Sequence, residues 1–353
     1  MPLRVVVWGP GNVGVPAIRS VARHPDLELA GVIVHSPEKE GRDAGELAGI
    51  EPLGIVATRD AEALLASRPD ALVYAVNGDF RPVESQKECC DALRAGIDVV
   101  TAGMYGLLHP ASAPEELRRA FEDACTAGGS SFLCSGIDPG FAIDLLPLVL
   151  SGCCQEIDEI RIVENFNYAH YDQPAAVRSL VGMGSAMDAT PPMLLPFALE
   201  SVWGGALRGL AAALDLEVEE IRTHVEKHAL ERDVENAMGR FEAGSQGGFR
   251  FEVSAIVGGE ARLVLEHITR IDDETAPQWP RPAKQGYHQI RISGHPDLVV
   301  TVECEDASGN HAGGGNSAAA ARIVNAIPTL HARPAGLVGA AELPLISGRG
   351  LVR

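Results

Sequence analysis

Short apolar runs alternate with amphipathic segments through the first 135 residues of the chain. The apolar runs have the length of strands and lie at 3–8, 29–34, 71–76, 98–101 and 131–134. Between them, apolar residues recur at helical spacing over about 17–22, 61–67, 83–95 and 114–127. Strands that alternate with helices in this way form βαβ units. The pattern therefore predicts an α/β fold with a doubly wound parallel sheet of the Rossmann type.

The pattern changes after about residue 150, where longer strand-type runs lie at 159–163, 249–257, 261–269, 287–293 and 298–304. In one of them Arg250, Glu252 and Ser254 alternate with apolar residues, which is typical of a sheet with one exposed face. Helices are predicted at about 192–214, with Glu200 as a buried carboxylate, and at 218–228 and 316–325. We therefore expect a first domain over residues 1–141 and a second α+β domain over residues 142–315, with a largely antiparallel, mixed sheet.

The residues between the first strand and the first helix read Gly9-Pro10-Gly11-Asn12-Val13-Gly14, a G-x-G-x-x-G pattern. Gly9 can make the tight turn, Gly11 lets the backbone approach a phosphate, and Gly14 lets the helix lie close to the strand. Free N–H groups at a helix N-terminus favour an anion there. We expect these six residues to cradle the pyrophosphate of a dinucleotide, and the alternative is a structural turn without a ligand.

The residues after the second strand bear on the choice between NAD and NADP. A site that prefers NAD usually has an acidic residue there, which binds the ribose 2′-hydroxyl. No carboxylate stands at the strand end in this chain, where Ser36, Lys39 and Arg42 could meet a 2′-phosphate instead. This pattern favours NADP as the cofactor, with His35 as a further contact. Glu38 and Glu40 keep NAD open as the alternative.

Other cofactor contacts are expected beyond the carboxyl ends of the later strands, because ligands of an open parallel sheet bind there. The loops that arrive at this edge contribute Asn77, Gly78, Thr101, Ala102, Gly103, Asp138 and Pro139. Asn-Gly and Asp-Pro-Gly are turn signals in their own right. For Asn77 and Asp138 a plain turn is therefore an equal alternative to a cofactor contact.

The second domain offers acid–base groups directly after its first strand. Glu164, Tyr168 and His170 lie within seven residues of one another and are of the types that move protons. If this segment lines the cleft, these three side chains are the catalytic candidates. The alternative is a surface loop with polar side chains.

Composition and charge narrow the range of partners. The formal net charge of −19 argues against nucleic acid and anionic membranes, which need a basic surface. No apolar stretch is long enough to span a bilayer, and no signal peptide is visible. The seven cysteines have no C-x-x-C or metal-type spacing, so we expect reduced thiols, a cytoplasmic location and no metal site.

Taken together, several segments resemble the dihydrodipicolinate-reductase-like proteins, and most of all the branch of 2,4-diaminopentanoate dehydrogenase and the native amine dehydrogenases. The segments are residues 9–14, 35–39 (His-Ser-Pro-Glu-Lys), 135–141 (Ser-Gly-Ile-Asp-Pro-Gly-Phe) and 325–328 (Asn-Ala-Ile-Pro). The resemblance implies a Rossmann domain to which the C-terminal helix and tail, 316–353, return, and a second domain for the substrate. It also implies a homodimer, a nicotinamide cofactor and reversible C–N redox chemistry on a small substrate.

Two departures from that family affect the expected chemistry. The His-His segment of dihydrodipicolinate reductases is absent, so reduction in lysine synthesis is not expected. The amine dehydrogenase branch carries a catalytic glutamate where this chain has Gly103-Met104-Tyr105-Gly106. Tyr105, His109, Glu164 or Tyr168 could supply the acid–base function instead, with the two tyrosines as the first choices for proton donor. Plain carbonyl or imine reduction and a non-catalytic NAD(P)-binding sensor remain as alternatives.

Overall fold

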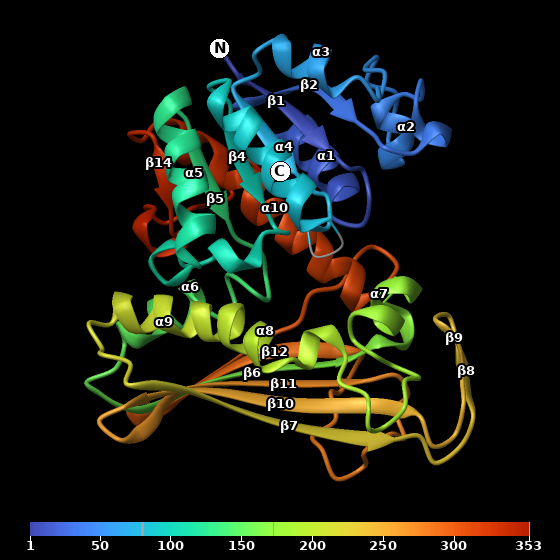
Figure 1. Ribbon diagram of the computed structural model, residues 1–353, viewed down its shortest axis with the longest axis vertical. Coiled ribbons are helices and arrows are strands. Elements are labelled where there is room, and N and C mark those ends of the chain that lie inside the picture. Colours follow the sequence, from blue (N-terminus) through green and yellow to red (C-terminus); the bar gives the residue numbers. More distant parts are fainter. Residues whose placement is uncertain (79–80, 172, 353) are drawn as a thin grey trace. The chain divides into compact units, whose positions relative to one another are not determined.

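The computed structural model describes residues 1–78, 81–171 and 173–352. The chain divides into two compact units, Met1–Ile137 with Asn316–Arg353, and Asp138–Gly315 (Figure 1). The second unit therefore begins a few residues before the boundary expected from the sequence. As a result Asp138 and Pro139, expected as cofactor contacts of the first domain, belong to the second unit.

The first unit contains a parallel sheet, as the sequence predicted, with six strands in place of the five expected. Its strands are β1 (Leu3–Trp8), β2 (Leu27–Ile33), β3 (Ala71–Tyr74), β4 (Asp98–Thr101), β5 (Ser131–Cys134) and β14 (Gly336–Val338), in the order β14-β5-β4-β3-β1-β2. A parallel bridge between Ile33 and Thr58 extends the sheet beyond β2. From β1 the chain continues to β2 at one edge of the sheet. It then returns to β3, which pairs with β1 on the opposite side from β2. This reversal between β1 and β3 is the position where such sheets bind ligands.

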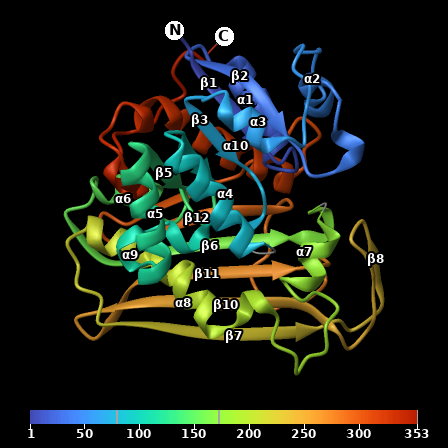
Figure 2. The same cartoon turned by 45° about the horizontal axis from the view of Figure 1, so that its top comes forward.

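Helices cover both faces of this sheet. They are α1 (Gly14–Arg23), α2 (Ala44–Ala48), α3 (Ala61–Ala66), α4 (Pro82–Arg94), α5 (Glu115–Gly128) and the part of α10 (His311–His331) that follows residue 315. Ile18 of α1 and Ile323 of α10 share one apolar core with Val5 and Val73 of the sheet. On the other face α4 and α5 lie side by side (Figures 1 and 2). Strand β14, in the tail that follows α10, was not expected from the sequence.

The second unit contains a six-stranded mixed sheet. Its strands are β6 (Glu156–Asn167), β7 (Glu220–Ala229), β10 (Gln246–Val257), β11 (Glu260–Arg270), β12 (Gly286–His295) and β13 (Leu298–Val302), in the order β13-β12-β6-β11-β10-β7. Every pairing is antiparallel except that of β6 with β11. A short hairpin of β8 (Val234–Asn236) and β9 (Gly239–Phe241) lies outside this sheet.

Short helices cover one face of the mixed sheet. They are α6 (Leu145–Ser151), α7 (Pro174–Ser179), α8 (Pro196–Ser201) and α9 (Trp203–Ala213) (Figure 1). Trp203, the first residue of α9, packs edge-on against Phe251 of β10. Phe251 in turn stacks on His267 of β11, so α9 is held over the centre of the sheet by aromatic contacts.

Two predictions for the second unit were wrong. The helix expected at 218–228 is strand β7, which pairs with β10 at the sheet edge. Ile221 and Val225 fit either period, but both and Thr223 between them are β-branched, which favours a strand, and β10 offers an edge to pair with. The helix expected at 192–214 is broken into three pieces at 192–194, 196–201 and 203–213. Glu200, expected to be buried, is exposed.

Candidate functional site

The glycine loop of the first unit leaves space for a phosphate beside its backbone. Gly9 adopts a φ of +89°, which favours glycine, and directs the chain out of β1. A Cβ on Gly14 would lie 2.1 Å from the carbonyl oxygen of Gly9, so α1 can lie this close to the strand only with glycine there. A Cβ on Gly11 would meet no protein atom within 4 Å. The space next to Gly11 therefore fits the dinucleotide pyrophosphate that the motif predicts.

The N-terminus of α1 faces this loop without a side-chain cap. Its N-cap residue, Val13, makes no side-chain capping hydrogen bond. The N–H of Val15 donates to the carbonyl oxygen of Gly11 and Pro16 has no N–H, so Gly14 supplies the N–H of the first turn that can meet an anion. Lys39 donates from Nζ to the carbonyl oxygen of Pro10, 2.7 Å away. This contact places an ammonium group at the edge of the loop, and the ammonium adds to the positive potential of the helix end.

A hydrogen-bonded row of side chains follows the end of β2. Trp8 donates from Nε1 to Nε2 of His35 at 3.2 Å, and Nη1 of Arg81 lies 3.0 Å from the same nitrogen. Indole and guanidinium groups only donate, so Nε2 of His35 is the acceptor and its proton sits on Nδ1. Burial, and after it the charge of Arg81, lowers the pKa of His35, which keeps the ring neutral.

Arg81 is the residue of this row that the sequence analysis missed. Its Nη2 donates to Glu88 at 2.9 Å, and the other oxygen of Glu88 accepts from the hydroxyl of Tyr74 at 2.6 Å. These contacts hold the guanidinium beside His35, with a third of its side-chain surface exposed. Among the predicted residues, Ser36 donates to Glu38, and Arg42 is exposed.

The loops after β3 and β4 meet through their backbones. A Cβ on Gly78 would lie 2.4 Å from the carbonyl oxygen of Gly103, so these two glycines permit the close approach. Thr101 donates to the carbonyl oxygen of Tyr74 and accepts from the N–H of Gly103. Its hydroxyl therefore holds the two loops together. Asn77 is exposed, whereas Ala102 is partly buried.

Two further acid–base candidates, Tyr105 and His109, belong to the first unit. Tyr105 begins a short 3-10 helix, 105–107, and is partly buried. Nδ1 of His109 lies 2.6 Å from the hydroxyl of Ser112, in the next turn of the chain. No carboxylate occurs between residues 102 and 109, so the segment offers a phenol and an imidazole where the resemblance implies a glutamate.

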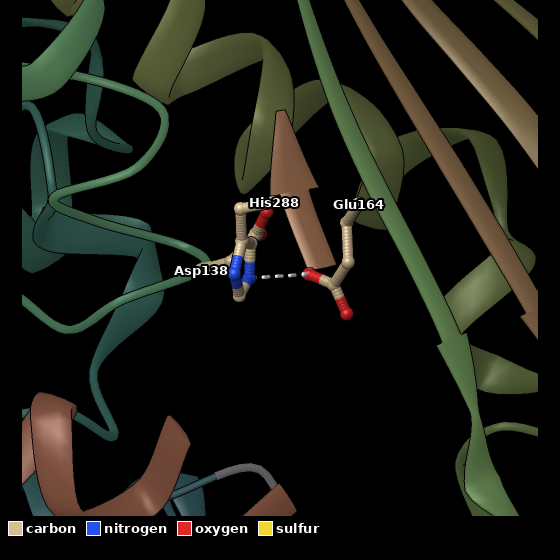
Figure 3. Close-up of side chains that lie close together, drawn as sticks. All are labelled: Asp138, Glu164 and His288. Carbon is tan, nitrogen blue, oxygen red and sulfur yellow. Dashed lines mark ion pairs between the residues drawn. The ribbon is translucent and has the colours of Figure 1, made fainter. Parts of the chain in front are cut away.

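In the second unit, strand register brings a carboxyl group between two histidines. Glu164 on β6 stands opposite His288 on β12 and opposite His267 on β11. Oε2 of Glu164 lies 3.7 Å from Nε2 of His288 and 3.7 Å from Nδ1 of His267. Asp138 reaches the same place from the loop that begins the unit, and Figure 3 shows it next to the ring of His288. We call Asp138, Glu164, His267 and His288 the buried acid cluster.

Burial controls the protonation of this cluster. It raises the pKa of Glu164 to about 7. Burial also raises the pKa of Asp138, and the charge of Glu164 raises it further. Burial and the neighbouring His288 lower the pKa of His267 to about 3, and burial lowers the pKa of His288 as well. At neutral pH both rings are therefore neutral, Asp138 carries a proton, and Glu164 is the group that gains and loses one.

Aromatic and hydroxyl groups surround the two carboxyl groups. Trp203 donates from Nε1 to Oδ1 of Asp138 at 3.4 Å, while Oδ2 is buried without a hydrogen-bond partner. The rings of Tyr168 and Tyr171 stack with centroids 4.6 Å apart. Burial, and after it the charge of Glu164, raises the pKa of both tyrosines. These phenols stay protonated at neutral pH and can donate to a bound oxygen or nitrogen.

The structure thus unites two of the three predicted acid–base residues of this unit. Glu164 and Tyr168 interact, whereas His170 is exposed and contributes its backbone carbonyl to Asn310. Asp138 joins the carboxyl cluster. His267 and His288 were not predicted from the sequence, because only the register of three paired strands brings them to Glu164.

The cluster also has the spacing of a cation site. One ligand atom each from Asp138, Glu164 and His288 lie within 4.8 Å of one another. The sequence predicted no metal site. The proximity of Asp138 and Glu164 is explained equally well without a metal ion, if the two carboxyl groups share a proton.

Two further observations concern the chain as a whole. All seven cysteines are reduced thiols, and four of them are buried. Among the described residues, no helix combines the length and the apolar character needed to cross a bilayer.

Two family models together match most of the chain. The model of the dihydrodipicolinate reductase N-terminus matches residues 3–102, and that of the 2,4-diaminopentanoate dehydrogenase C-terminal domain matches residues 141–349. An amine dehydrogenase from Streptomyces virginiae is 48% identical over 347 residues, which cover 97% of this chain and 96% of the relative. A 4-hydroxy-tetrahydrodipicolinate reductase from Synechocystis is 29% identical over 174 residues, 48% of this chain and 60% of the relative.

A solved structure shares the fold over the full length. The amine dehydrogenase from Mycobacterium smegmatis superposes with a TM-score of 0.76 at 22% identity, covering 99% of this chain and 98% of that one. The parallel sheet with its glycine loop, the two family models and the amine dehydrogenase relative along nearly the whole chain show a nicotinamide-dependent oxidoreductase. Within that class, the chain belongs to the family of amine dehydrogenases related to dihydrodipicolinate reductase and 2,4-diaminopentanoate dehydrogenase.

Proposed function

We propose that this protein interconverts a small ketone or aldehyde and the corresponding amine, with Glu164 and Asp138 as the acid–base pair. The observation that carries the proposal is the protonation pattern of the buried acid cluster. Glu164 titrates near pH 7, beside a carboxyl group that keeps its proton and two imidazoles that stay neutral. Such a group can take a proton from ammonium and return it during the same turnover.

In the reductive direction, the carbonyl compound, ammonium, NADPH and one proton give the protonated amine, NADP⁺ and water. The bound nicotinamide supplies the hydride. Glu164 takes a proton from ammonium, and the free ammonia attacks the carbonyl carbon. The carbinolamine loses its hydroxyl as water, with a proton returned by the carboxyl pair. The ionised carboxylate then stabilises the iminium cation until hydride reaches its carbon.

The position of Asp138 in the chain supports this division of labour. It follows the carboxyl end of β5 by four residues, and parallel sheets bind their ligands beyond such ends. The cluster also supplies the carboxylate that the segment after β4 lacks. We therefore assign the acid–base role to Glu164 and Asp138, with Tyr168 as a donor to the substrate oxygen. Tyr105 and His170 are weaker candidates on this arrangement.

The primary test measures cofactor oxidation by the purified, EDTA-treated chain. NADPH and NADH are offered separately with a panel of small ketones and aldehydes, with and without ammonium. Turnover that requires ammonium supports the proposal. Equal rates without ammonium would show a carbonyl reductase, and recovery only after a divalent cation is added would show that the cluster holds a metal ion.

The rate should depend on pH through the ionisation of Glu164. Because its ionised form is the base, kcat/KM for amination is expected to rise about tenfold per pH unit below pH 7 and to level off above it. This pH dependence of kcat/KM should disappear in the variant Glu164→Gln. A profile that keeps the same midpoint in that variant would assign the titration to another group.

We further propose that the adenosine end of the site prefers NADP. The support is the row after β2, where Arg81 and Lys39 bring positive charge and His35 offers Nδ1–H as a donor. Replacing Arg81 with methionine is expected to lower kcat/KM with NADPH by about tenfold or more while changing that with NADH little. Arg94→Met, an exposed arginine at the other end of α4, serves as the matched control. Equal losses with both cofactors would contradict the assignment.

A homodimer and a cytoplasmic location also remain proposals. The family resemblance supports the first and the seven reduced thiols the second. Light scattering on the purified protein should give twice the chain mass of 37.3 kDa.

A further inference from the structure

A buried tyrosine of the parallel sheet anchors the carboxylate that holds Arg81. Tyr74, the last residue of β3, has no exposed surface, and the ring of Trp8 packs edge-on against it. Its hydroxyl oxygen lies 2.6 Å from Oε2 of Glu88 and 2.9 Å from Oγ of the buried Ser85. Burial, and after it the hydrogen bond to Glu88, raises the pKa of Tyr74, so the phenol keeps its proton and donates it to the carboxylate. Glu88 is thereby tied to the end of a central strand.

Glu88 in turn fixes the orientation of the guanidinium group. Arg81 is the N-cap residue of α4, and Glu88 lies two turns further along the same helix. Oε1 of Glu88 accepts from Nη2 of Arg81 at 2.9 Å, while Nη1 of Arg81 donates to Nε2 of His35 at 3.0 Å. A guanidinium group is planar and rigid, so contacts at both terminal nitrogens fix its rotation as well as its position. The carboxylate side chain is 18% exposed and the arginine side chain 33%, so the anchor is the more buried partner of the pair.

Charge and orientation make opposite predictions for the role of Glu88. A phosphate that binds Arg81 also meets the negative charge of Glu88, which repels it. Glu84, an exposed carboxylate on the same helix, acts on Arg81 through its charge as well. If charge alone decided affinity, removing either carboxylate would strengthen the binding of a phosphate. Orientation predicts a loss for Glu88 alone, because an arginine that is free to rotate must give up its rotamer entropy when the phosphate binds.

We propose that Glu88 and Tyr74 are positioning residues that determine the preference for NADP, because they hold the guanidinium group of Arg81 ready for the 2′-phosphate. The inference rests on the NADP preference proposed above and extends it to two residues that act through Arg81. It places the selective element at the end of β3 and in α4, whereas the sequence pattern pointed to the residues directly after β2. A group built on a strand end and a helix is held more precisely than one on a loop.

The experiment measures nucleotide binding to the purified full chain and needs no turnover. Adenosine 2′,5′-bisphosphate and adenosine 5′-monophosphate differ only in the 2′-phosphate, and calorimetry gives the Kd of each. Glu88→Ala is expected to raise the Kd of the bisphosphate about tenfold and to leave that of the monophosphate unchanged. Tyr74→Phe should raise it about threefold, since Glu88 then keeps Arg81 but loses its own anchor. Glu88→Gln should restore most of the affinity, because its amide oxygen still accepts from Nη2 of Arg81.

Two further variants separate orientation from charge and from a general effect on the fold. Glu84→Gln removes the same charge from the same helix, and within the described parts of the chain Glu84 forms no ion pair with Arg81. This control should bind the bisphosphate as the wild type does or slightly more tightly. In an Arg81→Met background, the change Glu88→Ala should no longer alter the ratio of the two Kd values, because Glu88 acts only through Arg81.

Tighter binding of the bisphosphate by Glu88→Ala would overturn the proposal, because the charge of Glu88 would then outweigh its hold on Arg81. An equal loss for both nucleotides, or a loss that persists in the Arg81→Met background, would overturn it as well, since either result indicates a structural effect. Failure of the NADP preference itself has a different signature. The wild type would then bind the two nucleotides equally and Arg81→Met would change neither Kd, so both proposals would be wrong.

Discussion

Replacing Glu164 with glutamine is expected to abolish turnover and, at the same time, to make the protein more stable. Loss of the base should lower kcat by about 10²–10⁴-fold, the usual contribution of a positioned acid–base group. The gain in stability follows because the ionised carboxylate is buried between neutral groups. Glutamine keeps the shape of the side chain without the charge.

The direction of the stability change follows from proton linkage. The pKa of Glu164 is about 7 in the folded protein and ordinary in the unfolded chain. Between pH 4.5 and pH 7 the folded state therefore holds a proton that the unfolded state has lost. Wild-type stability falls as pH rises through this range and stays lower above it, by about 3 kcal/mol. The variant Glu164→Gln does not lose stability in this way as pH rises. Its Tm should therefore exceed that of the wild type above pH 7 and match it near pH 4.5.

Glu266 on β11 is the matched control, because it is equally buried but paired. It lies on the other face of the sheet, 2.6 Å from Nε of Arg250 and 3.8 Å from Arg161. Removing one partner of a buried pair leaves the other uncompensated, so Glu266→Gln should lower Tm while the folded protein keeps its turnover. Calorimetry and steady-state rates give both readouts. If both substitutions lower Tm, the carboxylate of Glu164 is paired and is not the base.

Replacing Gly11 with alanine is expected to remove cofactor binding and leave the unliganded protein intact. The added methyl group meets no protein atom within 4 Å, so the loop can keep its conformation. It would occupy the space that the pyrophosphate needs next to the backbone. We expect the Kd for NADPH, measured by fluorescence titration, to rise at least about tenfold, a loss of about 1.4 kcal/mol.

Gly14 provides the contrasting variant in the same loop. Its Cβ would lie 2.1 Å from the carbonyl oxygen of Gly9, so alanine there must push α1 away from the loop. Overpacking of this kind costs about 1–3 kcal/mol and should lower Tm even without cofactor. If Gly11→Ala binds NADPH normally, the loop is a structural turn and the dinucleotide binds elsewhere.

The first unit could be predicted closely from the sequence because its signals are local. The helix after Asp60 begins as expected, with Asp60 accepting from the N–H of Ala63. The helix expected over about 114–127 spans Glu115–Gly128, and Gly129 ends it in the left-handed conformation. Each of these features depends on neighbours a few residues away along the chain.

The second unit was harder to predict because its decisive contacts join residues far apart in the chain. Strand β7 was read as a helix, since Ile221 and Val225 fit a helical period and only pairing with β10 selects the strand. His288 lies 124 positions after Glu164, and His267 lies 103 positions after it. Nothing local to either histidine indicates that β6 lies between their strands.

By itself, the sequence determined the parallel sheet, the glycine loop and the family, because glycines and strand–helix alternation act within one βαβ unit. It also provided the candidates Glu164 and Tyr168 by residue type alone. Only the tertiary structure decided that Glu164 stands between two neutral histidines and next to Asp138. Protonation depends on burial and on neighbouring charges, and those exist only once separate strands have paired.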